Sequence, residues 1–165
     1  MISGRHLDVT IAFETYPERT YTRPMQNRPA DSGRPSSRLT ERQLERLIAR
    51  AREDSAVLAV VLFGSAARGQ ATSASDVDVC LVLNPDAADE AGRLRLAYLA
   101  EVDLDVQVFQ ALPVYVRHRV LREGRVLLSK NDDLLYELAI KTAQVFEDFK
   151  PIYRRYLETV LDDRP

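Results

Sequence analysis

Two largely apolar stretches, residues 57–63 and 77–83, constrain the fold of this chain more than any other feature. The first reads Val-Leu-Ala-Val-Val-Leu-Phe, and the second contains one charged residue, Asp78, near its start. Continuous runs of this length, rich in β-branched residues and bounded by glycine or by Asn84-Pro85, are typical of buried strands. We therefore predict that both stretches are strands.

Helix-capping residues, the spacing of apolar residues and helix- or strand-breaking residues predict the other elements. Thr40 with Gln43 matches a capping box, and apolar residues follow at helical spacing, so a helix is expected over about 40–53. The remaining predicted elements are a helix over 87–100, an alternating strand over 102–108, a short helix from 113 to 123 and a strand over 126–128.

Two helices are expected at the C-terminal end. Asp132 is predicted as the N-cap of a helix that reaches about Phe149. Pro151 cannot donate a backbone hydrogen bond, so we expect a break there and a separate last helix over 152–161.

The first 38 residues differ from the rest of the chain. They hold four of the eight prolines, and residues 24–37 have almost no large apolar side chain. Such a segment cannot bury enough surface to offset its ordering entropy. Val9, Ile11 and Phe13 alternate with polar residues, but a lone strand needs a partner sheet. We therefore divide the chain into a flexible tail, 1–38, and one domain, 39–165.

Composition excludes several classes of protein. The formal charge of −2 lacks the basic excess of proteins that bind nucleic acid directly. The single cysteine, Cys80, cannot form an intrachain disulfide and is expected in the core, which indicates a reducing cytoplasm. No apolar run approaches the roughly 20 residues that cross a membrane. His6 and His118 are expected at the surface, with no role.

A glycine–serine pair stands directly after the first strand. Residues 63–69 read Phe-Gly-Ser-Ala-Ala-Arg-Gly and are expected to open a short helix. Gly64 lets the backbone approach a ligand, and Ser65 and Ala66 can direct N–H groups toward phosphates. Taken alone, such a pair is usually an ordinary turn.

Asp76 and Asp78 follow about ten residues later. Carboxylates two apart on a strand project from one face, roughly 7 Å apart, and can converge on divalent cations. Taken alone, Asp76 is explained as a turn residue and Asp78 as a residue on the solvent-exposed face of a strand. Together, in an otherwise apolar strand, they would repel unless a cation neutralised them. The pair therefore indicates a magnesium site.

A third carboxylate is offered by the alternating strand. Asp103 and Asp105 share one of its faces, while Leu104 and Val106 share the other. Neighbouring strands can bring either aspartate to the first pair. Three carboxylates beside a glycine–serine loop are what two-metal phosphoryl or nucleotidyl transfer requires.

These residues resemble a known signature. Leu62 to Gly69, then Ser75-Asp76-Val77-Asp78, is similar to the Gly-Ser, ten residues, Asp-x-Asp pattern of the polymerase β-like nucleotidyltransferase superfamily. Ala67-Arg68-Gly69 and residues 112–128 resemble the minimal nucleotidyltransferase (MNT) antitoxins of HEPN/MNT toxin–antitoxin pairs. The resemblance covers roughly residues 40–160. It implies an α/β (α+β) fold in which helices flank a small mixed sheet.

The resemblance also implies roles for individual residues. Those that would hold the ATP triphosphate and two Mg²⁺ ions are Gly64, Ser65, Arg68, Asp76 and Asp78. We assign the third metal-binding acid to Asp105, because the family's third aspartate precedes an apolar pair and lies several residues before a proline. Asp103 is the rival.

The function implied is that of an Mg-dependent protein adenylyltransferase, an antitoxin that transfers AMP from ATP to a tyrosine of a cognate HEPN ribonuclease toxin. A small-molecule, aminoglycoside-type nucleotidyltransferase and a non-catalytic binding antitoxin remain the alternatives. We favour a protein acceptor because the apolar residues that could build a domain for a small acceptor are expected to cover the sheet instead. These residues are Leu134, Leu135, Leu138, Val145, Phe146 and Phe149.

Overall fold

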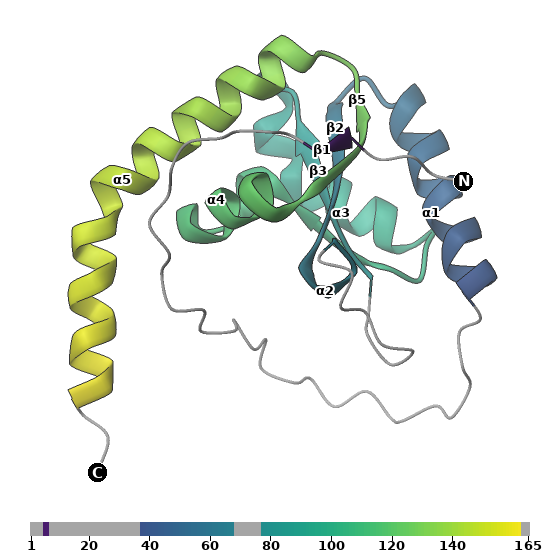
Figure 1. The fold of residues 1–165 in the computed structure, drawn as a ribbon. Helices are drawn as coiled ribbons and strands as arrows, with labels where there is room; N and C mark the ends of the chain where they lie inside the picture. The colour runs from purple at the N-terminus through teal and green to yellow at the C-terminus, as the bar shows by residue number, and fades with distance from the viewer. Residues whose placement is uncertain (1–4, 7–36, 68–76, 163–165) are drawn as a thin grey trace.

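The computed structural model describes residues 5–6, 37–67 and 77–162, which form a mixed sheet flanked by helices (Figure 1). The strand order is β1-β5-β2-β3-β4. In the centre, β2 (Val57–Phe63) pairs antiparallel with both β3 (Asp78–Leu83) and β5 (Arg125–Ser129). At one edge β4 (Asp105–Val108) runs parallel to β3, and at the other β1 (Arg5–His6) runs antiparallel to β5.

The helices form a layer on each face of the sheet. Two short 3-10 segments follow β3 and β4 in the chain: η1 (Pro85–Glu90) and η2 (Phe109–Ala111). The α-helices are α1 (Ser37–Glu53), α2 (Gly64–Ala67), α3 (Ala91–Leu99), α4 (Val114–Glu123) and α5 (Asp132–Asp162). No helix in the described part of the chain is long and apolar enough to span a membrane.

The two central strands alternate between two hydrophobic cores. Val60 and Leu62 of β2 pack with α1 and α3 on one face, whereas Leu58 and Val61 pack with α4 and α5 on the other. The residues of β3 from Val79 to Leu83 alternate in the same way and are all buried. Burial on both faces explains why β2 and residues 79–83 of β3 are continuously apolar, and the mixed sheet between helix layers confirms the predicted fold class.

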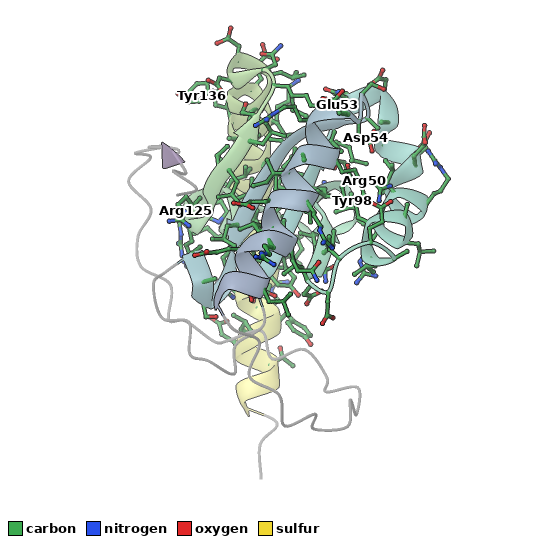
Figure 2. The ribbon with its side chains drawn as sticks, turned by 90° about the vertical axis from the view of Figure 1, so that its right-hand side faces the viewer. Arg50, Glu53, Asp54, Tyr98, Arg125 and Tyr136 are labelled. Atoms are coloured by element: carbon green, nitrogen blue, oxygen red, sulfur yellow. The ribbon has the colours of Figure 1, made fainter. Side chains whose placement is uncertain are left out.

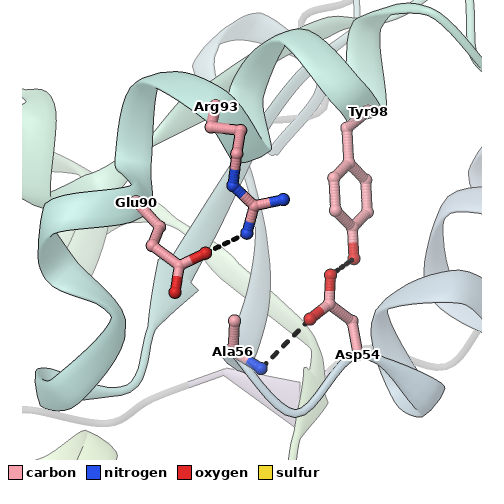
Figure 3. A network of polar contacts seen from close by, with 5 residues as sticks. All are labelled: Asp54, Ala56, Glu90, Arg93 and Tyr98. Carbon is pink, nitrogen blue, oxygen red and sulfur yellow. Dashed lines mark hydrogen bonds and ion pairs between the residues drawn. The ribbon is translucent and has the colours of Figure 1, made fainter.

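Helices α1 and α3 are joined by a polar cluster at the edge of the first core. The Tyr98 hydroxyl donates to Asp54 Oδ2 at 3.1 Å, and Asp54 Oδ1 accepts the Ala56 N–H at 3.0 Å (Figure 3). Arg50 lies beside Tyr98 (Figure 2). Its guanidinium is 4.0 Å from the centre of the Tyr98 ring, and it also donates to the Ala97 carbonyl. Burial and the neighbouring Asp54 carboxylate raise the pKa of Tyr98. This cluster fixes the layer that supports β3 and β4.

Some predicted helix boundaries were wrong. Helix α1 begins at Ser37, so Thr40 lies inside it and is not its cap. Gln43 Oε1 instead accepts the N–H of Asp103 at 3.4 Å. The segment predicted as one helix over 87–100 starts as the 3-10 turn η1 and becomes α-helical at Ala91.

The start and continuity of α5 also differ from prediction. Asn131, not Asp132, caps the helix, because its Oδ1 accepts the Leu134 N–H at 3.0 Å. The predicted break at Pro151 does not occur: α5 continues to Asp162 with the proline inside it. Tyr153 contacts Phe149 across the proline and stacks on Tyr115 of α4 at 5.2 Å. These ring contacts hold both sides of the proline in one helix.

Helix α5 also covers less of the sheet than predicted. Leu135 and Phe146 are buried, but Val145 is 54% exposed. The helix bends and its C-terminal half runs away from the sheet (Figure 1), where Ile152 and Tyr156 are likewise more than half exposed. The far half of α5 therefore presents apolar side chains to solvent.

Part of the predicted N-terminal tail joins the sheet. In β1, Arg5 pairs with Val126 and His6 with Arg125 of β5. The possible strand over residues 9–13 lies outside the described residues. The division at residue 38 stays a prediction for the remainder of the tail.

Candidate functional site

The turn between β2 and α2 is built for a glycine. Gly64 has φ +71°, a left-handed conformation that residues with a Cβ rarely adopt. A Cβ at this position would overlap Asp78 Oδ2 and would lie 3.1 Å from Asp78 Cγ. The Gly64 backbone therefore lies directly against the Asp78 carboxylate. Ser65, half-buried, follows in the first turn of α2.

The strand register places two predicted site residues side by side. Asp78, the first residue of β3, is paired with Asp105, the first residue of β4. Paired residues of neighbouring strands project from the same face of a sheet. That face is the one covered by α4 and α5, since the next residues, Val79 and Val106, belong to the opposite core. Both aspartates are half-buried.

A hydrogen bond within β4 orients one of these carboxylates. Gln107 Nε2 donates to Asp105 Oδ1 at 2.8 Å. The two residues are two apart on the strand, so they share a face, and the half-buried Gln107 is paired with buried Cys80 of β3. Sequence reasoning missed Gln107, although its parity with Asp105 was a usable signal.

Asp103 occupies a different position from Asp105. It lies in a bend before β4 begins, it is exposed, and its N–H points to Gln43 of α1. The predicted alternation of buried and more exposed residues holds over 102–108, but β4 itself begins only at Asp105.

Two predicted site residues, Arg68 and Asp76, lie outside the described residues. Within the part of the chain that the structure describes, no three His, Cys, Asp or Glu side chains are grouped to hold a metal ion. Asp78 and Asp105 form a pair of hard oxygen donors, which suits Mg²⁺, and Gly64 adds no side chain to the space beside them. This pair fits two of the three predicted magnesium ligands.

Two other titratable residues on this side of the sheet, Cys80 and His118, are buried. Cys80 is fully buried, which raises the pKa of its thiol, so it is the core residue predicted. His118 was expected at the surface, which is wrong: it is buried and stacks on Phe146 at 4.1 Å. Burial, with the nearby Arg122, lowers the pKa of His118 to about 4.

Comparison with known proteins identifies a family and a fold. Residues 45–133 match the family described as "Polymerase beta, Nucleotidyltransferase". A relative from Methanocaldococcus jannaschii, named "Putative protein adenylyltransferase", is 26% identical over 100 residues, 61% of this chain and 72% of the relative.

Solved structures share this fold at low sequence identity. A chain from a crystal structure of a toxin–antitoxin with AMP-PNP superimposes with a TM-score of 0.52 at 22% identity, over 74% of this chain and 99% of its own. A chain from the complex of a tri-AMPylated Shewanella oneidensis HEPN toxin with an MNT antitoxin gives a TM-score of 0.50 at 18% identity, over 75% and 98%.

Proposed function

The chain belongs to the polymerase β-type nucleotidyltransferase family, and on that premise we propose that it is an Mg-dependent protein adenylyltransferase. In this proposal it acts as an antitoxin that transfers AMP from ATP to a tyrosine of a HEPN ribonuclease toxin. The observation that carries the proposal is the pairing of Asp78 with Asp105 on one face of the sheet, directly beside the Gly64 turn.

The site residues share three tasks in the proposed reaction: holding the metal ions, receiving the triphosphate and activating the acceptor. Asp76, Asp78 and Asp105 hold two magnesium ions, which neutralise charge on the triphosphate when bound. Gly64 and Ser65 receive the triphosphate at the start of α2, and Arg68 contacts the phosphates. Asp105 also helps to activate the acceptor by accepting a proton.

The chemistry is a substitution at the α-phosphorus of ATP. The tyrosine oxygen forms a bond to this phosphorus, the bond to the bridging oxygen of the β-phosphate breaks, and pyrophosphate leaves. The tyrosine proton passes to the Asp105 carboxylate. The products are pyrophosphate and an AMP–tyrosine phosphodiester, so no oxidant or reductant is needed.

A protein acceptor is supported by the surface of α5. Val145, Ile152 and Tyr156 are large apolar side chains, each more than half exposed, on the helix that extends past the sheet. Apolar side chains gathered in this way are typical of protein interfaces. The name of the Methanocaldococcus jannaschii relative, "Putative protein adenylyltransferase", agrees with such an acceptor, as does the structural match from a complex of a tri-AMPylated HEPN toxin with an MNT antitoxin.

The proposal is tested by offering the protein two acceptors. The protein is incubated with Mg²⁺, α-labelled ATP and either a purified HEPN toxin encoded beside its gene or an aminoglycoside. We expect the mass of one or more AMP groups on toxin tyrosine, and none when Asp78→Asn replaces the wild type.

The alternatives give different results in the same experiment. A labelled aminoglycoside with unmodified toxin would favour a small-molecule nucleotidyltransferase. Inhibition of the toxin ribonuclease without any AMP transfer would favour a binding antitoxin without catalysis.

A further inference from the structure

We propose that Gln107 is a positioning residue of the site: its amide holds the Asp105 carboxylate in the orientation that binds magnesium. The inference rests on the proposed function and adds a residue to that site. It is based on two observations. Gln107 Nε2 donates a hydrogen bond to Asp105 Oδ1 at 2.8 Å, and the strand register pairs Asp105 with Asp78.

The alternation of side chains along β4 places Gln107 on the same face as Asp105. Asp105 and Gln107 are half-buried on the site face, whereas Val106 and Val108 are buried in the opposite core. A glutamine two residues along the strand is long enough to reach back to the carboxylate, as the observed bond shows. An asparagine at the same position is one methylene shorter and would fall short of it.

An amide is chemically suited to this task. A carboxylate can rotate about its last side-chain bond, and a hydrogen bond to Oδ1 fixes that rotation and with it the location of Oδ2. The amide donor is neutral, so it orients the carboxylate without bringing a positive charge that competes with a cation. Residues that hydrogen-bond to metal ligands typically change metal affinity or activity by 10–100-fold when they are replaced.

The chain also contains a glutamine with a different task. Gln110 bridges the backbone of Leu83, donating from Nε2 to its carbonyl at 2.8 Å and accepting its N–H at Oε1 at 3.1 Å. Leu83 is the last residue of β3, at the opposite end from Asp78. Gln110 therefore stabilises the sheet without touching a site carboxylate, and it is a matched control for Gln107.

The test measures binding of Mn²⁺, as a spectroscopic substitute for Mg²⁺, by electron paramagnetic resonance on the full chain without nucleotide. We expect Gln107→Met, which keeps the length and removes the donor, to raise the Kd for Mn²⁺ about 10-fold or more. Gln107→Asn should behave alike and serves if the first variant does not fold. Gln110→Met should lower the melting temperature and leave the Kd within about twofold.

A kinetic measurement separates positioning from a general loss of structure. In the AMP-transfer assay, the Gln107 variants should need about 10-fold more Mg²⁺ for half-maximal rate, with most of the rate recovered at saturating Mg²⁺. Folded Gln107 variants with wild-type Mn²⁺ affinity would overturn the inference and leave the proposed function intact. A wild-type protein that binds no Mn²⁺ and transfers no AMP would overturn both.

Discussion

Replacing Gly64 by alanine should damage the site through a single added methyl group. The Cβ would overlap Asp78 Oδ2 and would lie 3.1 and 3.4 Å from Asp78 Cγ and Cβ, so the carboxylate must move. The left-handed φ of +71° adds a cost of about 1–2 kcal/mol for a residue with a Cβ. A displaced, off-rotamer Asp78 adds about 0.5–1.5 kcal/mol.

The expected loss of unfolding free energy for Gly64→Ala is therefore about 1.5–3.5 kcal/mol, which urea unfolding can measure. The expected loss of function is larger. A metal-binding carboxylate that moves by about 1 Å can reduce the rate of transfer on the order of 100-fold. The AMP-transfer rate at saturating ATP and Mg²⁺, measured on protein shown to be folded, checks this value.

Two other glycines are matched controls. A methyl group added at Gly92 in α3 would have no atom within 4 Å, so Gly92→Ala should be neutral or stabilise by up to about 1 kcal/mol. A Cβ at Gly124 would overlap the Val120 carbonyl and Val61 Cγ1, so Gly124→Ala should destabilise the protein without displacing a site carboxylate. Folded Gly64→Ala that transfers AMP within a few-fold of the wild-type rate would refute the reasoning.

Three further predictions concern the third metal ligand, the Tyr98 hydrogen bond and the pH dependence of stability. Asp105→Asn should abolish metal binding while Asp103→Asn, in the exposed bend, should leave it unchanged; the reverse result in a Mn²⁺ titration would assign the third ligand to Asp103. Tyr98→Phe removes a hydrogen bond to the Asp54 carboxylate and should lower the unfolding free energy by about 1.5 kcal/mol, with unchanged Mn²⁺ affinity. Because folding lowers the pKa of His118 from 6.5 to about 4, the unfolded chain takes up the proton first, and stability should fall by up to about 3 kcal/mol between pH 6.5 and 4. His118→Phe should remove most of that loss in urea unfolding at pH 7 and 4.5, and an equal loss in both proteins would contradict the assignment.

The sequence predicted those elements whose signal is local. Strand β2 has the predicted bounds, because an apolar run that ends at a glycine needs no tertiary information. The end of β3 at Leu83 was also predicted correctly, because the Asn84-Pro85 pair that follows it is a local signal. The need for a glycine at position 64 could also be predicted from the sequence. Its contact with Asp78 could not, because that contact depends on the β2–β3 pairing, in which Phe63 is paired with Asp78.

The predictions that were wrong depend on contacts between distant segments. Pro151 predicts a break, yet Tyr153 stacks on Tyr115 of another helix and α5 continues. His118 lies in a charged stretch that resembles a surface, but α5 brings Phe146 over its ring. The preference for Asp105 over Asp103 was not among these errors: the two have equal parity in the sequence, and the register that pairs Asp105 with Asp78 distinguishes them.

Diffraction from crystals grown with Mn²⁺ and a non-hydrolysable ATP analogue tests the metal assignment most directly, because the anomalous signal locates the ion independently of activity. We predict anomalous density within ligand distance of carboxylate oxygens of both Asp78 and Asp105, beside the Gly64 turn. Density at another surface, with neither carboxylate in contact, would contradict the catalytic site described here.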